Sequence, residues 1–244
     1  MNDIGKAHLL NLNTIRKSTR IIDRELNLAI RGKNEFKEQM YIRILLFLWM
    51  TWAECKLNSL LTTQSQLSDD DRKFIQKKAK SEVERWFLLL DLLVRRRYLD
   101  GDEQKQLDEL TLGGVTFNRY STVQKMIERV GFYIEIRNRL AHGQWTVALN
   151  SNRTSENPKI TQSIWSITKT DILVLKRHLI ILGAIMHDLI ASRNAFEGGF
   201  RIHTKQLDKA IRDFEGKMDE FRKRLLSKPY YRYIAVGEVE PDID

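Results

Sequence analysis

The chain has 244 residues, enough for one large domain or two small ones, and 42% of them are hydrophobic, as in a soluble globular protein. Its 41 basic and 32 acidic residues give a formal net charge of +9, which implies attraction to a polyanion such as RNA, DNA or an anionic membrane, although a solvated basic surface would have the same charge. The single cysteine excludes an internal disulfide and a cysteine-based zinc site, and 12 glycines with 3 prolines are too few for many turns, so we expect long helices.

Apolar residues at spacings of three and four predict an amphipathic helix over residues 3–30. A second helix is expected over residues 36–61, apolar around most of its circumference and therefore central in the fold. Glu54 falls inside this helix and needs a partner there, because an isolated buried carboxylate is costly. Ser68 and three following aspartates predict the start of a third helix that runs to about Tyr98. Its final arginines, 95–97, suit the negative end of a helix dipole or form a phosphate-contacting patch.

A connection with a short helix around residues 104–110 is expected next, followed by a fourth helix that begins near residues 118–121. Its predicted buried stripe is Val123, Met126, Ile127, Val130, Ile134 and Leu140. After Gly143 the apolar pattern alternates, with Trp145, Val147 and Leu149 on one side, and residues 160–168 alternate in the same way. This pattern predicts a β-hairpin over about 145–168, joined by a polar loop.

Thr168 or Thr170 is the expected cap of a fifth helix that ends near residue 193, and Gly198-Gly199 is expected to break the chain. The last helix has an apolar seam with steps of four and three, formed by Leu207, Ile211, Phe214, Met218, Phe221 and Leu225. The seam favours a helical arm packed on the fifth helix over a dimer contact. A short strand at 230–236 would precede an acidic tail. We therefore expect two units, residues 1–195 and 196–244.

The most apolar runs, 44–53 and 179–186, are about half the ~20 residues that a membrane-spanning helix needs. The polar N-terminal residues do not resemble a secretory signal. We therefore expect a cytoplasmic protein with no membrane partner.

One stretch, residues 135–145, combines fixed positive charge, a titratable imidazole and a helix stop. Asn138 and His142 are four residues apart and share a helix face, whereas Arg137 lies about 140° from His142 around a regular helix. Gly143 predicts that the helix ends beside His142, so that a long arginine side chain could curl over the end and the three groups could meet.

These residue types suit RNA cleavage. A histidine can take or give a proton near neutral pH, and an arginine can hold a phosphate and stabilise the charge that develops on it. RNA supplies its own nucleophile in the 2′-hydroxyl, so no metal or cofactor is needed. The sequence has no His-Glu-x-x-His motif or other metal-ligand spacing. The pattern alone is also compatible with a helix end that has capping side chains.

The segment Arg137-Asn138-Arg139-Leu140-Ala141-His142 resembles the HEPN superfamily motif, in which an arginine, a polar residue and a short spacer precede a histidine. The resemblance covers roughly residues 36–193. It implies a mainly α, HEPN-like helical bundle, here with the predicted β-hairpin after the motif helix and the C-terminal arm. It implies a metal-independent endoribonuclease, a toxin or antiphage effector, acting as a homodimer with a composite active site. A cognate antitoxin or regulatory protein can hold such enzymes inactive.

The resemblance assigns Arg137 and His142 as catalytic residues and Asn138 as the polar residue that orients them. Arg139 is our candidate for a phosphate contact on RNA, and Glu54 for a carboxylate that supports Arg137. Two alternatives stay open. The chain could be a non-catalytic HEPN-like dimer that binds RNA or a nucleotide, or an interaction protein whose C-terminal arm recruits a partner.

Overall fold

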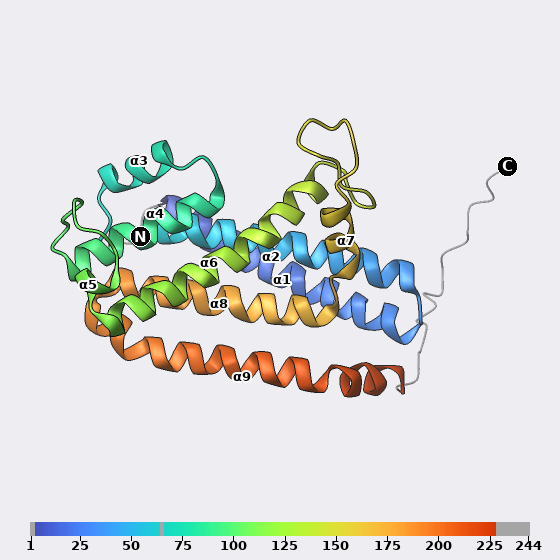
Figure 1. The fold of residues 1–244 in the computed structure, drawn as a ribbon. Helices are drawn as coiled ribbons and strands as arrows, with labels where there is room; N and C mark the ends of the chain where they lie inside the picture. Colours follow the sequence, from blue (N-terminus) through green and yellow to red (C-terminus); the bar gives the residue numbers. More distant parts are fainter. Residues whose placement is uncertain (1–2, 64–65, 228–244) are drawn as a thin grey trace.

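The structure, a computed structural model, describes residues 3–63 and 66–227, and within that part the chain is helical with no strand (Figure 1). The described helices are α1 (Asp3–Arg31), α2 (Glu35–Thr63), α3 (Asp69–Lys78), α4 (Glu82–Tyr98), α5 (Glu109–Leu112), α6 (Gly114–Ala141), α7 (Pro158–Ser166), α8 (Lys169–Ala191) and α9 (Arg193–Leu226). The predicted mainly α class is confirmed.

Helix α2 forms the centre of the bundle. It pairs with α1 through a short turn and also contacts α6 and α8. The first two predicted helices are confirmed, with bounds that differ by one or two residues. Residues Glu35–Thr62 meet the length and composition of a membrane span, but half of the apolar window is buried inside the bundle, and the core helix of a soluble protein meets the same criteria.

The prediction of a single third helix is wrong, because this segment forms two helices, α3 and α4. Ala79 ends α3 in an extended conformation, and the Ser81 hydroxyl then accepts a hydrogen bond from the Glu84 backbone N–H at 3.1 Å. Ser81 is therefore a second N-cap inside what reads as one amphipathic run. The predicted cap at Ser68 is confirmed, with a capping box to Asp71.

The arginines that end α4 stabilise the fold. Arg97 donates from Nε to the Leu189 carbonyl at 3.1 Å and also reaches the Ile190 carbonyl, which satisfies the C-terminal end of α8. Arg96 pairs with Asp71, and Arg95 donates to the Lys105 carbonyl at 2.6 Å. These contacts favour the structural interpretation of the three arginines over a phosphate-contacting patch.

The β-hairpin predicted at about 145–168 is wrong. Its second half is helix α7, which begins with Pro158 after Asn157, whose side chain accepts the Ile160 N–H at 3.2 Å. Ile160 and Ile164, four residues apart, are both buried, as on one side of a helix. The first half is an irregular loop with one isolated bridge, from Leu149 to Glu156.

The motif helix α6 begins at Gly114, earlier than predicted, and its predicted apolar stripe is buried. The short helix before it is α5, displaced from the predicted 104–110 to Glu109–Leu112. Thr168 is the cap of α8, as one of the two predicted alternatives had it.

Helix α9 packs along α8 and also contacts α1, which confirms the predicted packing of the arm on the fifth helix (Figure 1). Gly198-Gly199 does not break the chain, because the turn lies at Ser192 and α9 continues through both glycines. The division of the chain at residue 195 stays a prediction. The strand expected at 230–236 and the acidic tail lie outside the described residues.

The two glycines inside α9 allow a matched stability test. A Cβ at Gly199 would overlap the Asp188 carboxylate, which is held by His203 Nε2 at 2.9 Å, whereas a Cβ at Gly198 would meet nothing within 4 Å. We expect Gly198→Ala to raise the free energy of unfolding by about 1 kcal/mol, the difference in helix propensity between the two residues. Gly199→Ala should not raise the free energy of unfolding in this way, because its Cβ would overlap the Asp188 carboxylate. Urea unfolding of both variants measures the difference, and equal stabilisation would contradict the close approach of α8 and α9 at Gly199.

Candidate functional site

The motif lies at the C-terminal end of α6, and Gly143 ends the helix as predicted. Gly143 has a φ of +77°, and its N–H donates to the Leu140 carbonyl at 3.1 Å, while the Gln144 N–H donates to the Arg139 carbonyl at 3.0 Å. This pair of bonds is the Schellman motif, which glycine favours because it tolerates a left-handed backbone. His142 is therefore the C-cap residue of α6.

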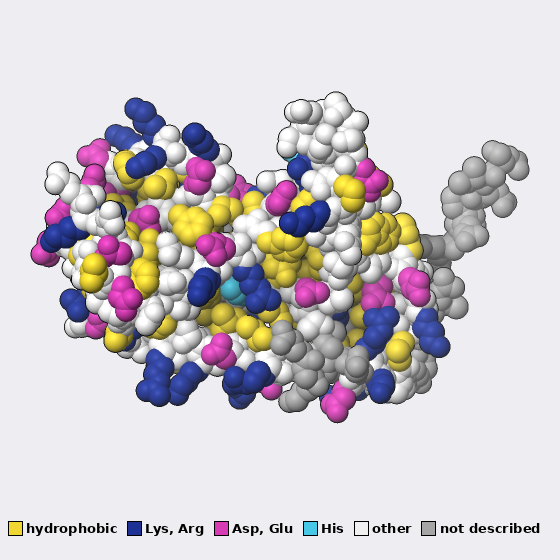
Figure 2. Space-filling view, viewed as in Figure 1, with side chains coloured by type: hydrophobic (Ala, Val, Ile, Leu, Met, Phe, Trp, Pro, Cys, Tyr) yellow, Lys and Arg dark blue, Asp and Glu magenta, His cyan; other side chains and the backbone are white. Residues whose placement is uncertain are grey.

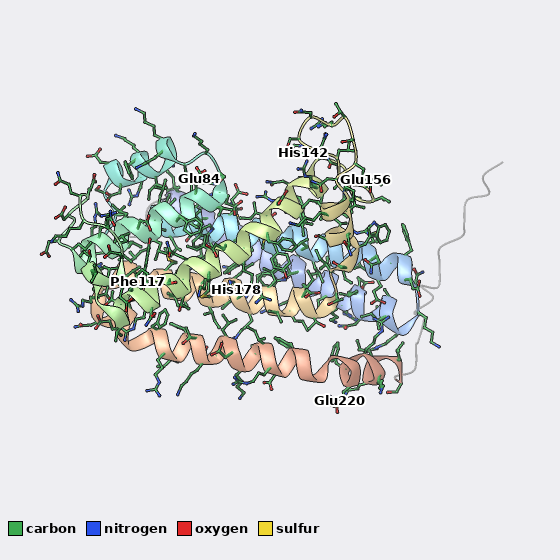
Figure 3. The ribbon with its side chains drawn as sticks, in the orientation of Figure 1. Glu84, Phe117, His142, Glu156, His178 and Glu220 are labelled. Carbon is green, nitrogen blue, oxygen red and sulfur yellow. The ribbon has the colours of Figure 1, made fainter. Side chains whose placement is uncertain are left out.

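His142 and Asn138 are both exposed. Figure 3 shows His142 on the upper projection formed by the end of α6 and the following loop, with Glu84, near the start of α4, on the other side of a gap. The space-filling view in Figure 2 shows the surface hollowed between this projection and the one that carries α3. His142 therefore lies beside this hollow, on the surface of the molecule.

Arg137 points away from that exposed position. Its Nη2 lies 2.6 Å from Oε2 of Glu82 on α4, and its Nη1 lies 3.4 Å from Oε2 of Glu54 on α2. The Arg137 side chain is 16% exposed and that of Glu82 only 6%. Glu54 has the expected contact with Arg137, and Arg85 Nη2 lies 3.9 Å from the same carboxylate, although the Glu54 side chain is 37% exposed and not buried as expected.

Glu82 is a member of this cluster that the sequence did not single out. Burial, against the attraction of Arg137 and together with the repulsion of nearby Glu54, raises the pKa of Glu82 to about 7. Its Oε1 is buried without a hydrogen-bond partner, as is Nε of Arg137. The cluster of Glu54, Glu82 and Arg137, which we call the arginine cluster, therefore holds two carboxyl groups and one fixed positive charge with part of its hydrogen-bonding capacity unused.

The structure brings Arg137 to Glu54 and Glu82 but does not join it to His142. No hydrogen bond or ion pair connects the two motif residues, in accordance with their separation of about 140° on a regular helix. Arg139 lies 4.0 Å from Glu135 and its side chain is 19% exposed, so it is only weakly paired.

Within the described residues, no three His, Cys, Asp or Glu side chains are grouped so that they could hold a metal ion. No family model, curated protein or solved structure matches the chain. The functional interpretation therefore depends on the motif and on the geometry described above.

Proposed function

We propose that the chain is a cytoplasmic, metal-independent endoribonuclease of the HEPN type, acting as a toxin or antiphage effector. The single observation that carries the proposal is the position of His142, which the Schellman motif holds exposed at the end of α6 beside the hollow. The net charge of +9 supports attraction of an RNA backbone to the protein.

In the proposed reaction the RNA 2′-hydroxyl attacks the adjacent phosphorus. A bond forms between O2′ and phosphorus while the bond from phosphorus to O5′ breaks, giving a 2′,3′-cyclic phosphate and a free 5′-hydroxyl. One imidazole removes the proton from the 2′-hydroxyl, and an acid protonates O5′. Asn138, exposed on the same helix face as His142, would orient the phosphate or the imidazole, and Arg139 would contact a neighbouring phosphate.

One chain offers a single His142, whereas the reaction uses both a base and an acid. A homodimer that brings two copies of the α6 end into one cleft would supply both, and would bring charge from one chain to the phosphate held by the other. We therefore propose a composite active site in a homodimer, with Arg137 stabilising phosphoryl charge once RNA competes with Glu54 and Glu82 for its guanidinium.

A second candidate function follows from the arginine cluster itself. Both carboxylates are paired with Arg137, so its guanidinium is not free to contact a phosphate in the single chain. This arrangement would suit a non-catalytic HEPN-like module that binds RNA or a protein. The protein bound by such a module would then be a cognate antitoxin or another regulatory protein.

The two candidates differ in turnover. We expect the purified full chain to cleave RNA in buffer with EDTA and to leave 2′,3′-cyclic phosphate ends, and its expression in cells to arrest growth while total RNA is degraded. Binding of RNA without cleavage, together with normal growth on expression, would support the non-catalytic module. Cleavage that requires added Mg²⁺ would contradict the proposed mechanism.

A further inference from the structure

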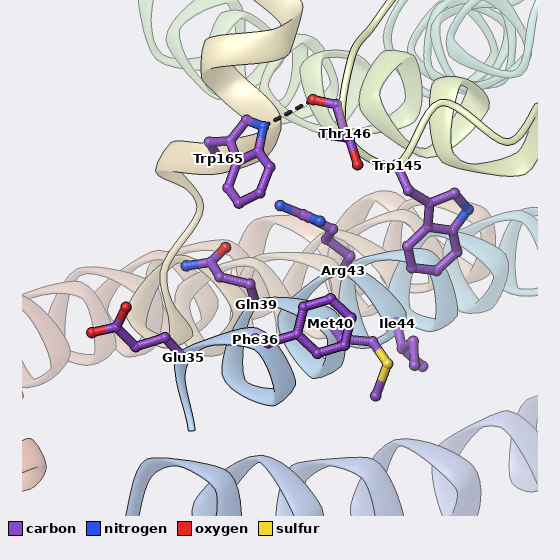
Figure 4. Close-up of a pocket in the computed structure, with 9 residues that line it drawn as sticks. All are labelled: Glu35, Phe36, Gln39, Met40, Arg43, Ile44, Trp145, Thr146 and Trp165. Atoms are coloured by element: carbon purple, nitrogen blue, oxygen red, sulfur yellow. Dashed lines mark hydrogen bonds between the residues drawn. The ribbon is translucent and has the colours of Figure 1, made fainter. Parts of the chain in front are cut away.

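A cavity of about 520 Å³ lies beside the motif, between the first turns of α2, the loop after α6 and helix α7 (Figure 4). Its walls are mostly apolar and include Phe36, Met40, Trp145 and Trp165. Phe36 is 79% exposed at the rim. Trp145 is only three residues beyond His142, so the cavity adjoins the end of α6.

Arg43 is the unusual group in this cavity. It is only 7% exposed, and no hydrogen bond or ion pair joins it to another described residue. Both Nε and Nη2 are buried without a partner, and these two nitrogens form one edge of the guanidinium. Its guanidinium packs on the Trp165 ring, whose centroid lies 4.1 Å from Cζ. A buried guanidinium without acceptors is costly, so an acceptor-bearing ligand is the natural complement.

Gln39 adds an acceptor to the same cavity. Its Oε1 is also buried without a partner, and it lies one turn before Arg43 on the same face of α2. Glu35, one turn earlier again, lines the cavity too, as Figure 4 shows. Glu35, Gln39 and Arg43 therefore line the cavity from one helix, with the Trp165 ring packed on the Arg43 guanidinium.

A hydrogen bond fixes the orientation of the Trp165 ring. Its indole N–H donates to the Thr146 carbonyl at 2.8 Å, the bond drawn in Figure 4, which fixes α7 to the loop after the motif. Flat aromatic faces beside a hydrogen-bonding edge are the usual elements of a site for an unstacked nucleobase.

We propose that this cavity binds one unstacked guanine base of the RNA substrate, next to the cleaved bond. Guanine offers two acceptors, O6 and N7, on the edge that an arginine can contact with two N–H groups, and its N1–H and N2–H donors suit Gln39 and Glu35. A phosphate group fits less well, because the cavity has one cation, a carboxylate and apolar walls that would not replace the water around a phosphate. The inference depends on the proposed function, since it names the base that the same enzyme would select.

Nucleosides without phosphate test the base site directly. Titration of the full chain with guanosine, adenosine, cytidine and uridine, followed by calorimetry and tryptophan fluorescence, should show guanosine binding about tenfold tighter than the others or better. Arg43→Met should abolish the preference while the protein stays folded, since it removes the desolvation cost of an unpaired buried charge and keeps an apolar side chain against Trp165. Phe36→Ala, a change at an exposed rim position, should weaken binding of all four nucleosides.

Lys37→Met is the matched control, because it removes a positive charge from an exposed position on α2 that does not line the cavity. It should leave guanosine binding unchanged. Equal binding of all four nucleosides, binding that survives Arg43→Met, or binding only of compounds that contain phosphate would each overturn the proposal, as would the absence of nucleoside binding.

The titration is independent of cleavage. If guanosine binds through Arg43 and the chain does not cleave RNA, the proposed function fails and the base site stands. If the chain cleaves RNA without binding nucleosides, the base site fails alone. Where both hold, sequencing of the RNA ends should find guanine beside the cleaved bonds, and Arg43→Met should randomise that position.

Discussion

His142→Ala should lower the rate of RNA cleavage by about 10²- to 10⁴-fold, the usual contribution of a general acid or base. The expectation depends on the exposed position of the imidazole at the end of α6, since histidine is the side chain that enzymes use most often as a general acid or base. The substitution removes an exposed side chain that makes no hydrogen bond within the described structure, so folding should be unaffected and RNA affinity should change little. Single-turnover cleavage with excess protein isolates the chemical step from product release.

His187→Ala is the matched control for this experiment. His187 is also exposed, but it lies on α8, outside the motif, and its imidazole is 3.7 Å from the neighbouring Asp188 carboxylate. Its substitution should leave the cleavage rate unchanged. A His142→Ala protein that cleaves RNA at the rate of the unsubstituted chain would show that the motif is a helix end without a catalytic role.

Local capping chemistry made several helix boundaries predictable. Ser68, Thr168 and Gly143 each satisfy backbone groups of their own helix end, so the signal and the structure that it specifies lie within a few residues of each other. The position of His142 at the end of α6 follows from the same kind of signal.

Where prediction failed, two local signals competed. Trp165 and Ile167 alternate as in a strand, but Asn157 and Pro158 form a helix start, and the spacing of Ile160 and Ile164 is helical. A short apolar run does not distinguish the two structures by periodicity alone, and packing on the bundle decides.

The arginine cluster shows a different limit. Glu54 could be named from sequence because a carboxylate inside an apolar helix needs a partner, whereas Glu82, at the start of α4, reads as an ordinary acid at the positive end of a helix dipole. Arg137 and Glu82 are 55 residues apart, and only the packing of α4 against α6 brings them to 2.6 Å. The guanine site likewise joins residues from α2, α7 and the loop after α6, which no local pattern connects.

Arg137→Met should lower the free energy of unfolding by about 3–5 kcal/mol, because it leaves the buried Glu82 carboxyl without its cation. Arg139→Met is a closely matched control, being the same change on the same helix at a nearly equal exposure, 19% against 16%. Glu135, with which Arg139 pairs, is 4.0 Å away and half exposed, so the loss should be less than about 1 kcal/mol. Urea unfolding measures both values, and equal losses would contradict a special role of the arginine cluster in stability.

The pH dependence of stability identifies the carboxyl responsible. Because burial raises the pKa of Glu82 from 4.5 to about 7 in the folded chain, the folded state binds a proton more readily than the unfolded state between these values. The contribution of Glu82 to stability should therefore fall as the pH rises from about 4.5 to about 7 and stay constant above it. Glu82→Gln should remove this fall, as urea unfolding at about pH 5 and about pH 8 would show. Arg137→Met combined with Glu82→Gln should recover most of the stability that Arg137→Met loses, since neither buried charge then remains, and a double variant as unstable as the single one would show that the loss comes from packing of the arginine stem instead.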